Sequence, residues 1–215
     1  MLYLFMVTFH SLSSMNIQTF NVGMLSTNCY VVNCLETKEA IIIDPGFEAD
    51  FEAEQVTRYV DGNALKLKFI VNTHGHADHI SGDLVLKRKY GVPIHIHRFD
   101  APCLDDLGES PPPANVLLED GALLKFGDVT LKVMHTPGHS LGSISLVGDK
   151  LVFTGDTLFA GGIGRTDFVG GSDLDMKSSL QKLVVLPDDF VVYPGHGCFS
   201  VMGEEKRANP FLLML

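Results

Sequence analysis

The segment 73–79 holds four potential metal ligands within seven residues: His74, His76, Asp78 and His79. It directly follows the apolar run 68–72, which predicts a buried strand. Imidazoles and a carboxylate at this density repel one another when charged, and their desolvation is costly. A bound dication removes this conflict because each lone pair then forms a bond to the metal. The segment therefore predicts a metal site at the end of a strand.

Three further candidate ligands lie downstream, each on a turn marked by glycine or proline: His139, Asp156 and His196. Seven ligands are too many for one tetrahedral ion and suit two ions that share a carboxylate. A non-enzymatic metal-binding module would not need such a mixed set with open positions. The residues therefore predict a metal-dependent enzyme.

Composition indicates a well-filled globule of one domain, with 215 residues and an apolar share of 46%. The net charge is −10, and no run of Lys or Arg offers the basic face that a nucleic-acid backbone requires. Two bound dications would, however, reverse the charge locally. Four cysteines without a Cys-x-x-Cys pair predict reduced thiols in a cytoplasmic protein. We expect a small-molecule substrate, and neither nucleic acid nor membrane as a partner; no oligomeric state is predicted.

The first fourteen residues are apolar and contain no Lys or Arg. They are too short to span a bilayer, and they lack the basic start of a secretory signal. Alternating strand character begins at Met15. We therefore predict a single domain over 15–215 and interpret 1–14 as a non-native or dispensable extension, with a short membrane-associating tail as the alternative.

Strands and helices alternate twice along the chain. In the first half, strands are predicted over 16–22, 29–35, 40–43, 68–71 and 93–97, and helices over 48–60 and from a Ser81 cap to Tyr90. Three prolines at 111–113 are expected to separate the halves. In the second half, strands are predicted over 116–126, 129–134, 143–147, 151–154 and 190–193, and helices over 173–186 and 204–215. This order predicts an α/β protein in which two βα halves form one sheet sandwich covered by helices.

The ordered set of Asp44, the 74–79 segment, His139, Asp156 and His196 resembles the five motifs of the metallo-β-lactamase superfamily. The resemblance extends from about Met15 to the end of the sequence. It implies a four-layer αβ/βα sandwich, in which two mixed β-sheets are covered by helices. The metal site of that fold lies at one edge, where loops of both halves meet.

The resemblance also implies a role for each ligand. One ion would be held by His74, His76 and His139, and the other by Asp78, His79 and His196. Asp156 would bridge the two divalent ions, for which zinc is the first choice and iron or manganese are alternatives. Asp44 would orient loop or ligand groups without binding metal. Asp44 also suits an Asx-type turn before Pro45, and the two roles are compatible.

A finer resemblance, to the short members of the glyoxalase II (hydroxyacylglutathione hydrolase) branch, lies in segments 155–159, 162–167, 194–197 and 204–210. It implies hydrolysis of an S-2-hydroxyacylglutathione-like thioester by a metal-bridging hydroxide that Asp78 orients or deprotonates. The extra C-terminal helical domain of longer members has no counterpart in this sequence. Arg165 and Asp167 stand where those members use Lys and Tyr for glutathione, and Arg165 could bind a carboxylate.

Two alternatives to thioester hydrolysis stay open. Persulfide dioxygenases share the 74–79 pattern and segment 164–168, but they use one iron held by two His and one Asp. Hydrolysis of another ester, a lactone, an amide such as a β-lactam, or a phosphodiester is the other alternative within this fold. The remaining histidines of the domain, His95, His97 and His135, are expected to be hydrogen-bonded or solvent-facing rather than ligands.

Overall fold

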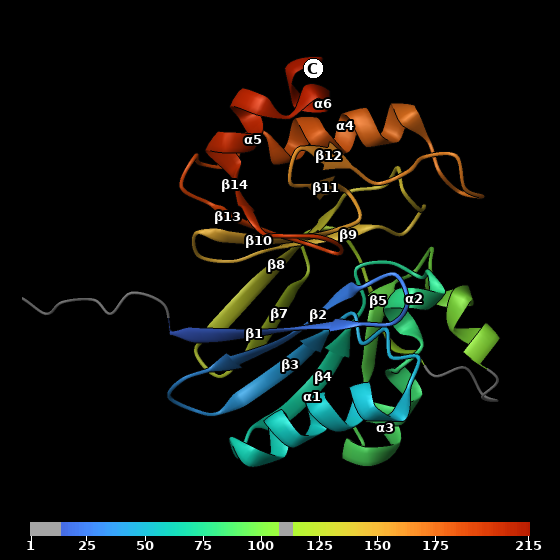
Figure 1. The fold of residues 1–215 in the computed structure, drawn as a ribbon, viewed down its shortest axis with the longest axis vertical. Helices are drawn as coiled ribbons and strands as arrows, with labels where there is room; N and C mark the ends of the chain where they lie inside the picture. The colour runs from blue at the N-terminus through green and yellow to red at the C-terminus, as the bar shows by residue number, and fades with distance from the viewer. Residues whose placement is uncertain (1–13, 108–113) are drawn as a thin grey trace, which may run out of the picture.

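The computed structural model describes residues 14–107 and 114–215. The expectations for residues 1–13 and for the prolines at 111–113 therefore lie outside the described residues. Two six-stranded sheets face each other, and helices cover the outer face of each (Figure 1). The structure thus has the predicted four-layer αβ/βα architecture of two mixed sheets covered by helices.

The first sheet contains the first six strands in chain order. Its strands are β1 (Met15–Val22), β2 (Thr27–Cys34), β3 (Glu39–Ile43), β4 (Lys66–Val71), β5 (Ile94–His97) and β6 (Ala114–Leu118). β1, β2 and β3 pair antiparallel, whereas β3 to β6 pair parallel. Helices α1 (Asp50–Gly62), α2 (Ala77–Ile80) and α3 (Asp83–Tyr90) supply the connections around β4, and the 3-10 helix Ala101–Leu107 follows β5.

The second sheet has the order β14-β13-β10-β9-β8-β7. Its strands are β7 (Leu123–Phe126), β8 (Val129–His135), β9 (Ile144–Val147), β10 (Leu151–Gly155), β13 (Val191–Pro194) and β14 (Ser200–Val201). A small hairpin of β11 (Leu158–Phe159) and β12 (Gly162–Ile163) follows β10. The outer helices are α4 (Asp173–Leu183), α5 (Met202–Ala208) and α6 (Pro210–Leu213).

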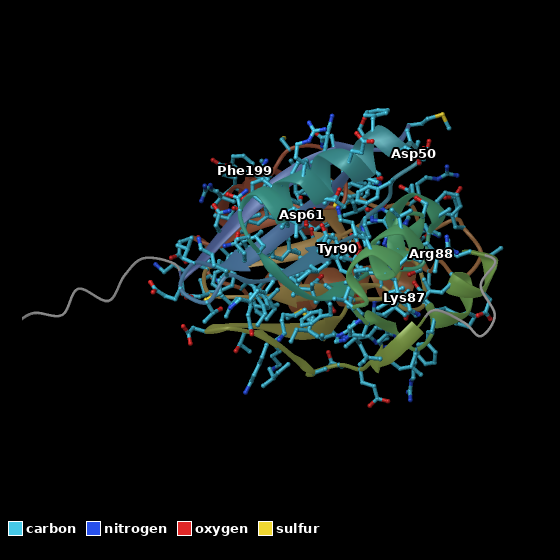
Figure 2. The ribbon with its side chains drawn as sticks, turned by 90° about the horizontal axis from the view of Figure 1, so that it is seen from below. Asp50, Asp61, Lys87, Arg88, Tyr90 and Phe199 are labelled. Carbon is cyan, nitrogen blue, oxygen red and sulfur yellow. The ribbon has the colours of Figure 1, made fainter. Side chains whose placement is uncertain are left out.

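Strand β2 illustrates how the first sheet is covered on both faces, by the second sheet on one side and by helices on the other. All eight of its residues are buried. Because side chains alternate along a strand, Val32 packs into the core between the sheets and Val31 into the core under the helices. Figure 2 shows the molecule from below, the side on which α1 and α3 lie. The two helices are joined there by a hydrogen bond from the Tyr90 hydroxyl to Asp61 Oδ1 at 2.9 Å. Burial on both faces explains the continuous apolar runs in the sequence.

The boundary between the halves differs from the expected position. The predicted strand 116–126 is wrong: it is two strands, of which β6 joins the first sheet and β7 begins the second. A turn at Gly121, with φ +78°, separates them, and the Gly121 amide donates to the Val133 carbonyl at 2.9 Å. Glycine adopts this backbone conformation without the steric cost that a side chain brings.

The predicted Ser81 cap is also wrong. Ser81 ends α2, and α3 begins after Gly82. The Gly82 amide donates to the Pro45 carbonyl at 2.7 Å, and a Cβ at this position would lie 2.2 Å from that oxygen. This close approach interrupts the helix and sets α2 apart as a short element that carries two of the candidate ligands. In residues 14–107 and 114–215, no helix is long and apolar enough to cross a membrane.

Candidate metal centre

All seven predicted ligands meet at one edge of the sandwich. His74 and His76 lie on the loop after β4, and α2 carries Asp78 and His79. The other three follow β8, β10 and β13, respectively: His139, Asp156 and His196. Rigid strands therefore present ligands from both sheets on short loops, as the sequence predicted.

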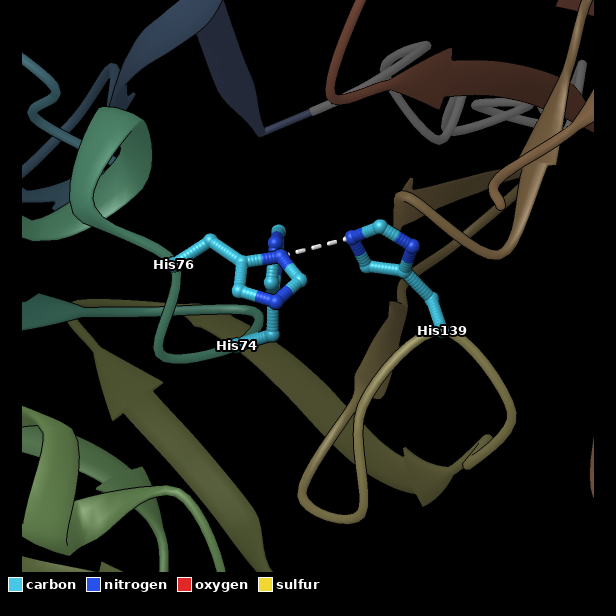
Figure 3. A group of neighbouring side chains, drawn as sticks. All are labelled: His74, His76 and His139. Atoms are coloured by element: carbon cyan, nitrogen blue, oxygen red, sulfur yellow. Dashed lines mark hydrogen bonds between the residues drawn. The ribbon is translucent and has the colours of Figure 1, made fainter. Parts of the chain in front are cut away.

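The first donor group comprises His74, His76 and His139, and their ligand atoms all lie within 4.8 Å of one another. His76 Nδ1 lies 2.8 Å from His139 Nε2, with the two rings perpendicular at 90° (Figure 3). His74 lies beneath them, and its Nε2 is buried without a hydrogen-bond partner. An unpartnered buried nitrogen is costly unless a metal or another donor engages it.

The second donor group comprises Asp78, His79 and His196. His79 Nε2 lies 3.2 Å from His196 Nε2, and Asp78 Oδ2 lies 3.4 Å and 3.3 Å, respectively, from these two nitrogens. Two nitrogens bound to one tetrahedral zinc ion lie roughly 3.4 Å apart, given Zn–N bonds of about 2.0–2.1 Å. The spacing of the second group therefore fits one ion.

Asp156 lies between the two groups. Its Oδ1 is 3.5 Å from His79 Nε2, and its Oδ2 is 3.5 Å from both His139 Nε2 and His196 Nε2. Oδ1 is buried without a hydrogen-bond partner. One carboxylate thus faces the donors of both groups, which is the placement that a bridging ligand needs.

The outer nitrogens of three imidazoles contact an acceptor, and their inner nitrogens face the other donors. His139 Nδ1 donates to the Arg165 carbonyl at 2.7 Å, and His196 Nδ1 donates to the Leu25 carbonyl at 3.1 Å. His74 Nδ1 lies 3.1 Å from Thr73 Oγ1, whose own proton goes to Asp44. Since a carbonyl only accepts, each outer nitrogen that faces one carries a proton, and in the neutral imidazole Nε2 keeps its lone pair for a metal.

Asp44 organises the fourth imidazole and the loop that precedes the ligands. Its Oδ2 lies 3.0 Å from His79 Nδ1. The same carboxylate accepts from the Thr73 amide and the Thr73 hydroxyl, both at 2.7 Å. Asp44 adopts a positive φ of 51° where β3 ends. The structure therefore places Asp44 where it can both shape the turn and orient His79, on the Nδ1 side of the ring and away from the Nε2 atom that faces the other donors.

Without metal, the centre holds opposing charges. Burial lowers the pKa of His74 well below its usual range, and the pKa of His76 is lowered for the same reason. Burial alone would also lower the pKa of His196, but Asp156 and Asp78 outweigh it and raise that pKa to about 10. Burial opposes ionisation of Asp78 and Asp156, yet the neighbouring imidazoles dominate and lower both pKa values. Cations that replace the His196 proton would satisfy the same carboxylates, so the donor set fits two divalent ions.

One organising residue escaped the sequence analysis. Asp100 is 4% exposed, and its Oδ2 accepts from the Gly75 amide at 2.9 Å and from the Ser140 hydroxyl at 2.6 Å. Its Oδ1 accepts from the Gly142 amide at 2.7 Å. Asp100 thereby ties the loop that carries His74 and His76 to the loop that carries His139. The only signal in the sequence is a single Asp shortly after a predicted strand.

The other histidines lie outside the donor groups. His95 stacks on Phe69 with ring centroids 4.4 Å apart, and burial lowers its pKa to about 4. His97 stacks on His135 at 4.2 Å, and His135 Nε2 donates to the Leu141 carbonyl at 2.9 Å. His97 and His135 thus have the expected hydrogen bonds. His95 differs from the expectation, because it packs on Phe69 and its Nδ1 is buried without a hydrogen-bond partner.

A pocket of about 900 Å³ opens above the donor groups, with His76, Asp78, His139, Asp156 and His196 among its lining residues. Arg165 lines the same pocket and pairs with Asp167, so that Arg165 Nε and one terminal nitrogen each donate at 2.8 Å. The protein thus combines an αβ/βα sandwich with a cluster of His and Asp side chains at one edge. These two features define a class of αβ/βα metalloproteins.

Comparison with known proteins agrees with this class. The sequence model of the metallo-beta-lactamase superfamily matches residues 22–196. An uncharacterized protein of Mycobacterium leprae is 40% identical over 92% of this chain and 99% of its own length. Hydroxyacylglutathione hydrolase GloC of Haemophilus influenzae is 36% identical over 92% of this chain and 98% of its own length. This chain therefore belongs to the metallo-beta-lactamase superfamily.

Solved structures are similar over nearly the whole chain. BLEG-1 B3 metallo-beta-lactamase has a TM-score of 0.82 and 33% identity, covering 92% of this chain and 99% of its own. ETHE1 from Myxococcus xanthus has a TM-score of 0.79 and 32% identity, covering 91% of this chain and 83% of its own. TTHA1623 in a di-iron-bound form has a TM-score of 0.79 and 32% identity, covering 91% of this chain and 100% of its own.

Proposed function

We propose that this protein is a hydrolase of small hydroxyacyl thioesters that works with two divalent metal ions. The observation that carries the proposal is the pair of donor groups with Asp156 between them, at the floor of one pocket. The similarity to a relative named hydroxyacylglutathione hydrolase supports the substrate class. The substrate is accordingly a small molecule with an acyl–sulfur bond.

The proposed ligands follow the two groups. His74, His76 and His139 would hold one ion, and Asp78, His79 and His196 would hold the other. Asp156 would be the ligand that the two ions share. Zinc is the first choice, and iron is the main alternative because the structural neighbour TTHA1623 is known in a di-iron-bound form.

When bound, the ions lower the pKa of a coordinated water and polarise the substrate carbonyl. Asp78 is the residue proposed to orient the attacking water, because its Oδ2 is fixed by the Thr27 hydroxyl at 3.0 Å and its side chain reaches the pocket. The lowered pKa of Asp78 keeps it a carboxylate at neutral pH, so it accepts a hydrogen bond rather than storing a proton. A thiol leaving group has a pKa of about 8.5, and the site therefore needs no strong general acid.

Persulfide oxidation at a single iron is the second candidate, raised by the segment 164–168. The second donor group weighs against it. Asp78 and His79 belong to the 74–79 pattern that the one-iron enzymes share, so His196 is the member of this group that bears on the choice. Its Nε2 lies 3.2 Å from His79 Nε2 and 3.3 Å from Asp78 Oδ2, which completes a set of donors for a second ion.

Metal analysis and two activity assays on the purified protein test the proposal. Near two metal ions per chain, together with loss of thioester absorbance from S-D-lactoylglutathione, is the expected result. Asp156→Ala should lose both properties, whereas the matched control Asp149→Ala, at an exposed position, should retain them. Oxygen uptake with glutathione persulfide, without thioester loss, would overturn the proposal in favour of the second candidate.

A further inference from the structure

Exposed apolar side chains gather around the mouth of the pocket above the donor groups. Four loops of the described chain supply them, and we call these five residues the apolar wall: Leu25, Phe99, Leu141, Phe168 and Val169. Their exposed fractions range from 42% for Phe168 to 102% for Val169. Large apolar side chains that converge on one opening mark a ligand-binding surface.

Phe168 connects the apolar wall to the donor groups. Its ring lies edge-on to His76 and to His139, with centroid distances of 5.3 Å and 5.9 Å. The Arg165 guanidinium lies over the Phe168 ring, 4.3 Å from its centroid. These contacts place the ring beside His76 and His139, where it can contact a group attached to the substrate carbonyl.

The charge on this side of the pocket is cancelled. Among the described residues that line the pocket, Arg165 is the only Lys or Arg. The Arg165 guanidinium donates from Nε to Asp167 Oδ1 and from Nη2 to Asp167 Oδ2, each at 2.8 Å. A glutathione carboxylate would therefore meet a guanidinium whose charge Asp167 already offsets, and it would compete with Asp167 for the Nε and terminal-nitrogen donors. An uncharged group meets no such competitor.

The pocket is also larger than a small acyl group requires. At about 900 Å³ it lies at the upper end of the range of roughly 300–1,000 Å³ that holds drug-sized ligands. A lactoyl group alone would leave most of this volume and most of the apolar wall uncovered. The remaining part of the substrate, its thiol half, is therefore the part that can reach the apolar wall.

We propose that the thiol half of the substrate is an uncharged apolar group, aryl or alkyl, seated on the apolar wall. This inference rests on the proposed thioester hydrolysis. In that reaction the acyl carbon–sulfur bond breaks and a carbon–oxygen bond to water forms. Water supplies the oxygen of the acid and the proton of the departing thiol. The apolar wall binds the thiol half of the substrate, which is the leaving group.

Matched lactoyl thioesters of benzyl mercaptan, N-acetylcysteamine and glutathione test the preference in the metal-loaded enzyme. We expect kcat/KM for the benzyl thioester to exceed both others by at least about tenfold, the low end for burial of an apolar group in a pocket. Phe168→Ala should remove this advantage, while the control Val185→Ala, at an exposed position away from the pocket, should keep it. Equal kcat/KM values, or a preference for glutathione, would overturn the inference.

Binding of non-hydrolysable thioethers separates this inference from the proposed function. By calorimetry, benzyl methyl sulfide should bind the metal-loaded protein at least about tenfold more tightly than S-methylglutathione. If it does so while no thioester is cleaved, the proposed hydrolysis fails and the apolar site stands. If S-methylglutathione binds as tightly or more tightly, the apolar site fails whatever the activity.

The variant Asp167→Asn tests the charge argument directly. Freed from its carboxylate partner, Arg165 should lower KM for S-D-lactoylglutathione by about two- to fivefold, the scale of an exposed ion pair. The KM for the benzyl thioester should stay unchanged. An unchanged KM for the glutathione thioester would show that Asp167 does not shield Arg165 and would overturn this part of the inference.

Discussion

Replacing Asp156 with alanine is expected to weaken both donor groups at once. Oδ1 of this carboxylate lies 3.5 Å from His79 Nε2, and Oδ2 lies 3.5 Å from His139 Nε2. His79 belongs to the second donor group, and His139 belongs to the first. Asp156 is the proposed ligand that the two ions share, so its loss cannot be confined to one of them.

The magnitude follows from counting the affected ions. Loss of a group that merely supports a metal ligand commonly costs about 10–100-fold in affinity or activity. Applied to each of two ions, the same factor gives a fall of about 10²–10⁴-fold in affinity for the metal pair, provided that the two effects multiply. His196→Ala removes a donor from the second group alone, and its effect should stay nearer to about 10–100-fold.

Three measurements on Asp156→Ala, His196→Ala and Asp149→Ala would establish this order. Metal content is determined by mass spectrometry, affinity by competition with a chelator, and turnover with S-D-lactoylglutathione. Circular dichroism of the metal-free variants checks that each one folds. Two firmly bound ions and near wild-type turnover in Asp156→Ala would refute the placement of Asp156 between the ions.

Three further predictions concern the same centre. The loaded wild-type protein should hold close to two ions per chain, and a ceiling of one ion, with His79 and His196 replaceable without loss of activity, would contradict the two-group assignment. The raised pKa of His196, about 10, means that this imidazole is protonated at pH 7 without metal. Metal binding should then release about one proton from it, and affinity should increase with pH up to about 10; calorimetry in two buffers of different ionisation enthalpy that detects no proton release would contradict this. Asp100→Asn should loosen the first donor group by about 10–100-fold in metal affinity and alter the visible spectrum of the cobalt-substituted protein, because its Oδ2 ties the two ligand loops. The exposed Asp105→Asn is the matched control for this change, and an unaltered spectrum in Asp100→Asn would show that Asp100 does not position the ligands.

Acceptor groups around the metal-free centre contact the outer nitrogens of the ligand imidazoles. His139 and His196 each donate to a backbone carbonyl, and His79 faces Asp44. Each contact fixes the ring and its tautomer before metal arrives. These partners lie far from their ligands in the chain, so no short motif contains them.

The sequence by itself determined the kind of site and the architecture. His74, His76, Asp78 and His79 lie so close together in the chain that any fold must bring them near one another, and their chemistry already predicts metal. The alternation of apolar strands with amphipathic helices predicted two covered sheets, because periodicity is a local property of the chain. The glycine- and proline-marked turns predicted the three downstream ligands.

Only the tertiary structure decided which distant groups support that site. Asp100 accepts from Gly75 and Ser140, 25 and 40 residues away in the chain, and such contacts depend on how the two sheets pack. The boundary between the halves depended in the same way on whether β6 pairs with β5 or with β7, which local strand character does not encode. The edge-on contact of Phe168 with His76 likewise joins two segments that lie far apart in the chain. Residue type and spacing thus fix the chemistry that is available, whereas packing between distant segments fixes its geometry and the surface that meets the substrate.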